Sequence, residues 1–182
     1  MVLNSQKISV HEFDMWVHQP ENVDTQYEFI GGKIVEVVSN SKSSNTGLLI
    51  GSFITVHVHN HDLGHTTGAD GGYQVGDERY IPDMGFISKA RMPELENASY
   101  ISIAPDLALE VISPTDTTRQ ITAKVANYLA AQTTVWLVYP HDEEIEIYAP
   151  AQAMVKLTKD DELDGGTILP DFKLSLQTVF NS

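Results

Sequence analysis

A nearly continuous apolar run over residues 105–114, Pro-Asp-Leu-Ala-Leu-Glu-Val-Ile-Ser-Pro, constrains the fold of this sequence more than any other feature. So apolar a strand is normally buried on both faces, at the centre of a sheet between helices. Because side chains alternate along a strand, one face carries Asp106, Ala108, Glu110 and Ile112, and the other carries Leu107, Leu109 and Val111. An ionised carboxylate buried alone is costly, so Glu110 must be protonated, paired with a cation or bound to a metal. Two carboxylates on one face of a central strand favour a functional site over a structural ion pair.

The composition excludes several classes of protein. The 182 residues include no cysteine, which rules out disulfides and thiolate metal sites and fits a reducing interior. No secretory signal is recognisable, and no apolar run approaches the roughly 20 residues that span a bilayer. The length fits one domain over residues 1–182, and we expect a cytoplasmic protein without a membrane segment.

The charge balance limits the partners that the chain can bind. The net charge is −14, from 25 acidic and 11 basic residues. A nonspecific grip on a phosphate backbone depends on clustered lysine and arginine, so this balance argues against a strong general nucleic-acid binder. It leaves room for a local basic groove, or for a site where a divalent metal offsets carboxylates.

Turn and capping signals divide the chain before the apolar run into short elements. Ser9 and Glu12 form a capping-box pattern that predicts a helix within residues 7–20. Two β-rich runs around Gly31 and Gly32 predict a β-hairpin over residues 27–38. We also expect a helix over 47–61, turns around short strands over 64–76 and a polar loop over 89–99. Within residues 79–87 we expect a strand that opens at Pro82-Asp83, because a proline is tolerated at a strand start.

After the apolar run, a helix and further strands are predicted. Thr117 and Gln120 form a second capping box, and apolar residues at helical spacing then extend an amphipathic helix to about Ala131. A buried strand over 135–139 follows, and this strand–helix–strand order implies a right-handed parallel crossover. We further expect an antiparallel strand over 144–148, a polar hairpin over 151–163, a strand over 168–176 and a final turn at 179–180.

Four histidines gather at the end of the second predicted helix: His57, His59, His61 and His65. On a helix, His57 and His61 share a face, as do His61 and His65, and such spacing can ligate zinc. The plainer interpretation is a polar helix end that places imidazoles near the C-terminal dipole. No glutamate lies between these histidines as it does in zincins, which favours the plainer interpretation.

Glu28, Asp83, Glu110 and Lys124 form a candidate constellation. Asp83 and Glu110 begin or lie within buried strands, and two carboxylates near one sheet end suit Mg²⁺ or Mn²⁺. Such an ion can orient a water and neutralise charge on a phosphodiester, while a nearby lysine stabilises the transition state. Lys124 lies at the margin of its helix's apolar stripe, so it either returns to the sheet end or stays solvated. Glu28 has a plain alternative too, on an exposed hairpin face.

These residues, in this order, resemble the Uma family of restriction-endonuclease-like proteins, part of the PD-(D/E)XK nuclease superfamily. The resemblance covers roughly residues 8–180 and includes the opening hairpin at 27–33 and the closing segment at 169–176. It rests on Glu28, Pro82-Asp83, the apolar run at 105–114, Lys124, Tyr128 and the strand at 135–138.

The resemblance implies an α/β fold with a restriction-endonuclease-like mixed β-sheet flanked by helices and an N-terminal β-hairpin. It also implies a metal-dependent phosphodiesterase site. Asp83 would match the superfamily's metal-binding aspartate, Glu110 the acid of its third motif, and Glu28 the glutamate of its first motif. Asp83 and Glu110 would therefore be the metal ligands.

Three positions depart from the family pattern or lack an assigned role. The third motif normally carries a lysine where this chain has Ile112, and Lys124 on the following helix would replace it. Asn45 stands where the resemblance leads us to expect a histidine. Asp106 resembles a family position that would support the site.

Three functions follow as hypotheses. The favoured one is a Mg²⁺- or Mn²⁺-dependent DNA endonuclease with Glu28, Asp83, Glu110 and Lys124 as catalytic residues. The second is a noncatalytic nuclease-fold protein that acts through interaction or regulation, and the third is a zinc hydrolase built on the histidines. A homodimer is expected, because two sites can then address the two strands of a duplex. No predicted helix carries the arginine, asparagine and glutamine residues that read bases in a major groove.

Overall fold

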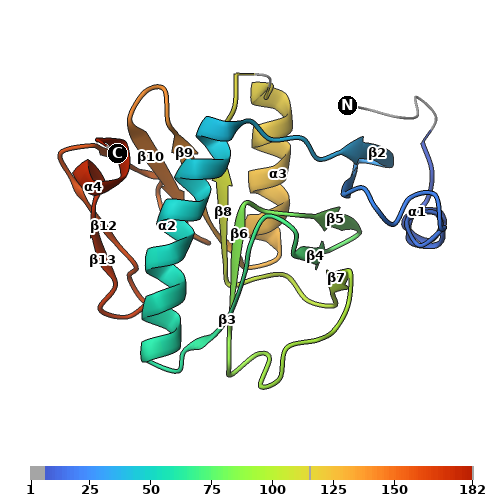
Figure 1. Ribbon diagram of the computed structural model, residues 1–182, viewed down its shortest axis with the longest axis horizontal. Coiled ribbons are helices and arrows are strands. Elements are labelled where there is room, and N and C mark those ends of the chain that lie inside the picture. Colours follow the sequence, from blue (N-terminus) through green and yellow to red (C-terminus); the bar gives the residue numbers. More distant parts are fainter. Residues whose placement is uncertain (1–6, 115, 182) are drawn as a thin grey trace.

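The computed structural model describes residues 7–114 and 116–181, and within them the strands form three sheets (Figure 1). The six-stranded sheet contains β3 (Gly64–Thr67), β6 (Met84–Ser88), β8 (Leu107–Val111), β9 (Thr134–Tyr139), β10 (Glu144–Tyr148) and β11 (Val155–Thr158). The five-stranded sheet contains β1 (Tyr27–Ile30), β2 (Lys33–Glu36), β4 (Gly72–Val75), β5 (Glu78–Tyr80) and β7 (Tyr100–Ile101). A small sheet pairs β12 (Glu162–Asp164) with β13 (Lys173–Ser175), and the helices are α1 (Val10–Val17), α2 (Ser41–Asn60), α3 (Thr118–Ala130) and α4 (Leu176–Phe180).

β8 lies inside the six-stranded sheet, whose order is β11-β10-β9-β8-β6-β3. It runs antiparallel to β6 and parallel to β9, and α3 makes the crossover between the two parallel strands. All five residues of β8 are buried. The predicted central strand, parallel crossover and mixed sheet are therefore confirmed.

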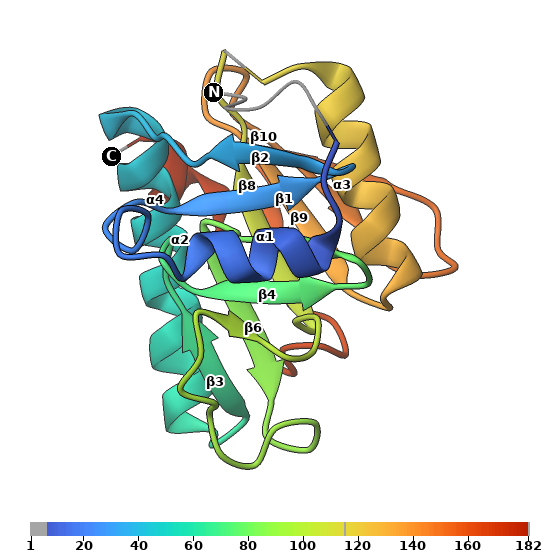
Figure 2. The same ribbon diagram turned by 90° about the vertical axis from the view of Figure 1, so that its right-hand side faces the viewer.

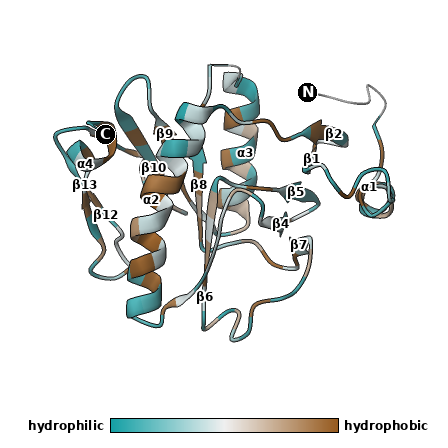
Figure 3. Cartoon of the chain, viewed as in Figure 1, coloured by the Kyte–Doolittle hydropathy of each residue, from teal (hydrophilic) through white to brown (hydrophobic). Residues whose placement is uncertain are grey.

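The two faces of β8 belong to two different hydrophobic clusters, as the alternation along the strand predicts. Leu107, Leu109 and Val111 pack with residues of α2, whereas Ala108 packs with residues of α3. The two helices therefore cover opposite faces of the six-stranded sheet, and Figures 1 and 2 show them on either side of β8. In Figure 3 hydrophobic and hydrophilic residues alternate along α2, and its last turn is hydrophilic.

The five-stranded sheet has the order β2-β1-β5-β4-β7 and carries the predicted N-terminal hairpin. Gly31 and Gly32 both have positive φ angles, which the tight turn between β1 and β2 requires. α1 covers this sheet by burying Phe13 and Val17, and Figure 2 shows it in front of β1 and β4. Tyr80 of β5 joins the α3 cluster, so this sheet borders the face that α3 covers.

Both predicted capping boxes are present, at Ser9 for α1 and at Thr117 for α3. α2 begins at Ser41, six residues before the predicted start at residue 47, because the Asn40 side chain accepts a hydrogen bond from the Ser43 backbone. Asn is among the best N-cap residues. The polar residues 41–46 that follow it form a helix although they show no apolar residues at helical spacing. The prediction was wrong about the start because it relied on that pattern.

The strand predicted to open at Pro82-Asp83 is confirmed as β6, which begins at Met84, but residues 79–80 belong to another strand, β5. The chain leaves the five-stranded sheet after Tyr80 and enters the six-stranded sheet at Met84. Pro82 has no backbone N–H, and the Ile81 N–H donates to the Glu28 carboxylate, so neither residue continues a ladder. The break places Asp83 between the two sheets.

The expected hairpin over 151–163 was also wrong. β11 pairs with β10, whereas β12 pairs with β13, so two different sheets share this segment. The closing segment forms a short strand, Lys173–Ser175, and then the helix Leu176–Phe180, in place of one strand over 168–176. No helix in residues 7–114 or 116–181 is both long and apolar enough to cross a membrane.

Candidate functional site

The break after Tyr80 brings two carboxylates together at one end of the six-stranded sheet. Met84 pairs with Leu109, so the antiparallel register sets Asp83 beside Glu110 just beyond the last paired residues of β6. The Asp83 Oδ2 atom accepts a hydrogen bond of 2.7 Å from the Val111 N–H. This side chain replaces a backbone partner, because β6 pairs with β8 only as far as Leu109. Gly47 of α2 lies next to this contact, where an added Cβ would stand 3.4 Å from the Asp83 Cβ.

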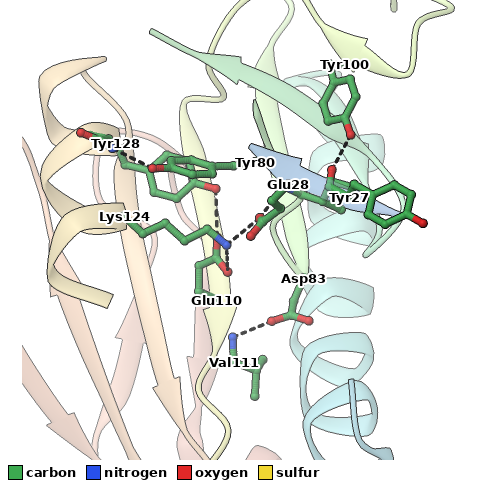
Figure 4. Close-up of polar contacts among 11 residues, drawn as sticks. Tyr27, Glu28, Tyr80, Asp83, Tyr100, Glu110, Val111, Lys124 and Tyr128 are labelled. Atoms are coloured by element: carbon green, nitrogen blue, oxygen red, sulfur yellow. Dashed lines mark hydrogen bonds and ion pairs between the residues drawn. The ribbon is translucent and has the colours of Figure 1, made fainter. Parts of the chain in front are cut away.

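Lys124 reaches back from α3 to the sheet and joins two glutamates (Figure 4). Its Nζ atom lies 2.8 Å from Oε1 of Glu28 and 2.9 Å from Oε2 of Glu110. The same Glu28 oxygen accepts a 2.8 Å hydrogen bond from the Ile81 N–H. Both glutamates are buried, at 7% and 9% exposure, so Glu28 does not lie on an exposed hairpin face. Of the two alternatives for Lys124, the structure has the one in which its ammonium returns to the sheet end.

Two tyrosines complete the surroundings of the lysine. The Tyr128 hydroxyl donates a 2.9 Å hydrogen bond to Oε1 of Glu110, so each oxygen of that carboxylate has a donor. The Lys124 ammonium lies 5.3 Å from the centroid of the Tyr80 ring, within the range of a cation–π contact. The Tyr80 hydroxyl accepts a hydrogen bond from Asn127, which holds the ring in place.

Burial and charge shift the pKa values of the cluster. Burial raises the pKa of Glu110; Lys124 opposes this rise, while Glu28 and Asp83 add to it. Burial also raises the pKa of Asp83, against the Val111 N–H and Lys124. For Lys124, burial lowers the pKa, but Glu110 and Glu28 outweigh burial and the net pKa is raised. Lys124 therefore keeps its proton at neutral pH, so it can stabilise negative charge but cannot act as a general base.

A pocket of about 500 Å³ opens beside the cluster and is lined by Glu28, Asp83, Glu110 and Lys124. Among the described residues, Oδ1 of Asp83 and Oε2 of Glu28 have no hydrogen-bond donor. Three carboxylates line this pocket with one ammonium, which contacts Glu28 and Glu110 but not Asp83, and burial makes their ionisation costly unless another cation binds. Carboxylate oxygens suit Mg²⁺ or Mn²⁺, so the donor set fits these metals.

No group of three or more His, Asp or Glu side chains in the described part of the chain is arranged to hold a metal on its own. Asp83 and Glu110, the predicted metal ligands, offer only two carboxylates. Mg²⁺ commonly binds through one or two carboxylates and takes its remaining ligands from water and substrate phosphates, so two carboxylates still fit that ion.

Asp106 is the carboxylate that the structure does not bring to the site. It lies just before β8, at the strand end opposite to Glu110, where it accepts hydrogen bonds from the Ser88 N–H and from Arg91. The ion-pair interpretation therefore holds for this residue. Asn45 is exposed on α2, and Ile112 packs against the α3 cluster.

The histidines do not form the cluster that their spacing suggested. His57 and His61 do share a helix face, and their ring centroids are 4.3 Å apart. However, His57 contacts the Pro170 carbonyl through Nε2, and His61 contacts the His57 carbonyl through Nδ1. α2 ends at Asn60, so His65 lies in β3 and the predicted helical pairing of His61 with His65 was wrong.

Tyr128, Tyr80 and Asn127 are site neighbours to which sequence reasoning gave no role. One signal was available for Tyr128, because it lies four residues after Lys124 and therefore on the same helix face. A buried tyrosine also needs a partner for its hydroxyl. Tyr80 carried no comparable signal, since its contact with Lys124 depends on how the two sheets pack.

Comparisons with known proteins identify relatives of this chain. The model of the Uma2 family, described as "Putative restriction endonuclease", matches residues 10–177. A crystal structure of a putative nuclease belonging to DUF820, from Anabaena variabilis, has a TM-score of 0.82 and 24% sequence identity to this chain. That similarity covers 96% of this chain and 98% of the other, and it confirms the predicted fold class. No curated protein matches the sequence.

Proposed function

Because this chain belongs to the Uma2 family of putative restriction endonucleases, we propose that it hydrolyses phosphodiester bonds in DNA with a bound Mg²⁺ or Mn²⁺ ion. One observation carries the proposal: Asp83, Glu110 and a protonated Lys124 line a single pocket at the end of the central sheet. A pair of carboxylates with an adjacent cation suits the chemistry of a phosphodiester, whose hydrolysis builds up negative charge.

The proposed roles follow from the contacts. Asp83 and Glu110 would hold the metal, which supplies a water of lowered pKa and offsets charge on the phosphate. Lys124 would stabilise the charge that builds up on phosphorus-bound oxygens as water attacks and the ester P–O bond breaks. Glu28 would position Lys124, because its carboxylate contacts both that ammonium and the Ile81 N–H. The departing oxygen takes a proton from solvent, which balances the reaction.

Plasmid nicking with Mn²⁺ tests this function, and the chain offers a matched control. Asp83 and Asp106 each accept a backbone N–H near β8, but at opposite ends of the strand. Asp83→Asn should abolish nicking, and Asp106→Asn should leave it in place if the protein stays folded by circular dichroism. Equal nicking by wild type and Asp83→Asn would contradict the proposal.

A noncatalytic nuclease-fold protein is the second candidate, and one observation favours it. Lys124 donates a hydrogen bond to one Glu110 oxygen and Tyr128 donates one to the other, so Glu110 is fully paired as a structural acid without any metal. In that case Mn²⁺ would bind without any cleavage of supercoiled, linear or single-stranded DNA. Nicking by wild type alone would exclude this candidate.

Three expectations from the sequence belong to this proposal as well: one domain over the whole chain, a cytoplasmic location and a homodimer. Pairing would let two sites address the two strands of a duplex. Light scattering at micromolar concentration should give a mass near twice that of the chain, which is 20.1 kDa. A mass of one chain at every concentration would contradict the dimer.

A further inference from the structure

The cations of this acidic protein divide into two groups. The chain has 11 lysine and arginine residues. Seven form ion pairs: Arg79, Lys89, Arg91, Lys124, Lys156, Lys159 and Lys173. Within the described part of the chain, the other four make no ion pair: Lys7, Lys33, Lys42 and Arg119. All four are exposed, so their charge is offered to solvent or to a ligand.

These four residues come from elements on one side of the molecule. Lys42 and Arg119 lie in the first turns of α2 and α3, and Lys33 begins β2. Lys7 lies at the hairpin tip, where its Cβ is 3.3 Å from the position of a Cβ added to Gly32. Figures 1 and 2 show β2 and the starts of α2 and α3 in the upper half of the molecule, with β2 to the right of both helix starts in Figure 1.

The same elements form the wall of the pocket that holds Asp83 and Lys124. Asn40 and Ser43, which flank Lys42 in the sequence, line it, and so does Gln120, the residue after Arg119. Val35 of β2 lines it too, two residues along the strand from Lys33 and therefore on the same strand face. The four unpaired cations do not line the pocket themselves, but Lys33, Lys42 and Arg119 lie on the elements that form its wall, and Lys7 lies beside the turn that begins β2.

We propose that Lys7, Lys33, Lys42 and Arg119, the cation rim, bind the phosphate backbone of a nucleic acid whose scissile phosphate enters this pocket. The inference rests on the proposed nuclease function, and it names the surface on which that function depends. Because these cations are unpaired, they can bind a phosphate without breaking an existing ion pair. Several such cations bind a polyanion more tightly than they bind a small anion. The rest of the chain carries a strongly negative net charge. Repulsion from those acidic residues and attraction to the cation rim would together orient an approaching nucleic-acid strand.

The salt dependence of DNA binding tests the cation rim. The wild-type protein is titrated, in the presence of Ca²⁺, into a fluorescent DNA duplex and into the corresponding single strand. For the DNA that binds more tightly, the binding constant is then measured by fluorescence anisotropy at several KCl concentrations. The rim variant carries Lys7→Gln, Lys33→Gln, Lys42→Gln and Arg119→Gln. The control carries Lys89→Gln, Lys156→Gln, Lys159→Gln and Lys173→Gln, which removes the same charge from exposed lysines that are ion-paired.

Each phosphate contact contributes about 0.9 to the slope of log K against log salt for duplex DNA and about 0.7 for single strands. The rim variant should therefore lose a slope of about 2 to 4, whereas the control should keep the wild-type slope. Equal slopes for wild type and rim variant, equal losses in both variants, or no binding of either DNA at low salt would overturn the inference.

Nicking assays on the same samples separate this inference from the proposed function. DNA binding that depends on the cation rim but leaves plasmid intact would support the surface and contradict the nuclease. Nicking by wild type with a slope that the rim variant leaves unchanged would support the nuclease and contradict the surface.

Discussion

Lys124 is the only cation in direct contact with Glu28 and Glu110 among the described residues, and both carboxylates are buried. Removing one partner from a buried ion pair leaves the other charge uncompensated, which costs more than the pair itself contributes. The stability of this part of the fold therefore depends on the ammonium group, whatever chemistry the site performs.

Lys124→Met should lower the free energy of unfolding by about 3 kcal/mol at pH 8, because two buried glutamates lose their counter-ion. The loss should shrink towards pH 5, where Glu110, whose pKa burial raises, takes up a proton and no longer needs a counter-ion. Urea unfolding at both pH values measures it. Lys156→Met, which breaks the exposed pair with Glu144, is the control and should change little. Equal losses for the two variants would contradict the account.

Tyr128→Phe removes one hydrogen bond and keeps the ring. The Glu110 Oε1 atom would then be buried without a donor, which costs about 1–3 kcal/mol of stability. The variant should also weaken Mn²⁺ binding, since Tyr128 orients the carboxylate. Tyr148→Phe, whose hydroxyl bonds to Glu146, is the control and should leave Mn²⁺ binding unchanged. A Tyr128→Phe protein with wild-type stability and Mn²⁺ affinity would show that the hydrogen bond matters little.

At this scale the sequence indicates the residue types of the site but not how they pair. The buried position of Glu110 demanded a cation, a proton or a metal, and the cation is Lys124. The helix pattern could not choose between the sheet and solvent for Lys124, because a marginal position allows both. Alternation along the strand places Asp106 on the same face as Glu110. However, Asp106 lies four residues away at the other end of the strand, where it forms an ion pair with Arg91.

Among the elements, β8 and the segment that precedes β6 position the site. The identity of β8 as a central strand follows from its apolar run, and its two faces follow from alternation. The division of residues 79–87 between two sheets was not predictable from propensity alone. It depends on Glu28, which lies on a strand 53 residues earlier in the chain and whose carboxylate accepts a hydrogen bond from the Ile81 N–H.

α2 packs closely against this break because Gly47 has no side chain. A Cβ there would lie 3.4 Å from both the Asp83 Cβ and the Val111 Cγ2 atoms, which is ordinary contact. Gly47→Ala should therefore fold normally, keep the proposed nicking activity and gain up to about 1 kcal/mol of stability from helix propensity. Gly47→Val should push Asp83 away and abolish nicking. Thermal unfolding and plasmid assays measure both variants, and full activity in Gly47→Val would contradict this packing.

The whole molecule carries a net charge of −14, and three of its acidic residues, Glu28, Asp83 and Glu110, line one pocket. Because burial raises the pKa values of Asp83 and Glu110, the folded protein binds protons more tightly there than the unfolded chain does. The cluster's contribution to stability is therefore full below the usual carboxyl pKa range and falls as the pH rises through the raised values.

A divalent ion should replace those protons. The increase in the unfolding temperature caused by Mn²⁺, relative to EDTA, should be larger at pH 8 than at pH 6, because the ion competes with protons at pH 6. Asp83→Asn should abolish the increase at both pH values, and Asp106→Asn should keep it. A larger increase at pH 6 would contradict the linkage.

Calorimetric titration with Mn²⁺ at pH 8 tests the central claim, that Asp83 and Glu110 hold a divalent metal. Wild type and Asp106→Asn should bind one ion with similar affinity, whereas Asp83→Asn and Glu110→Gln should show no saturable binding. Wild-type affinity in both of those variants, or no binding by the wild-type protein, would contradict the claim and leave Glu110 as a structural acid paired with Lys124.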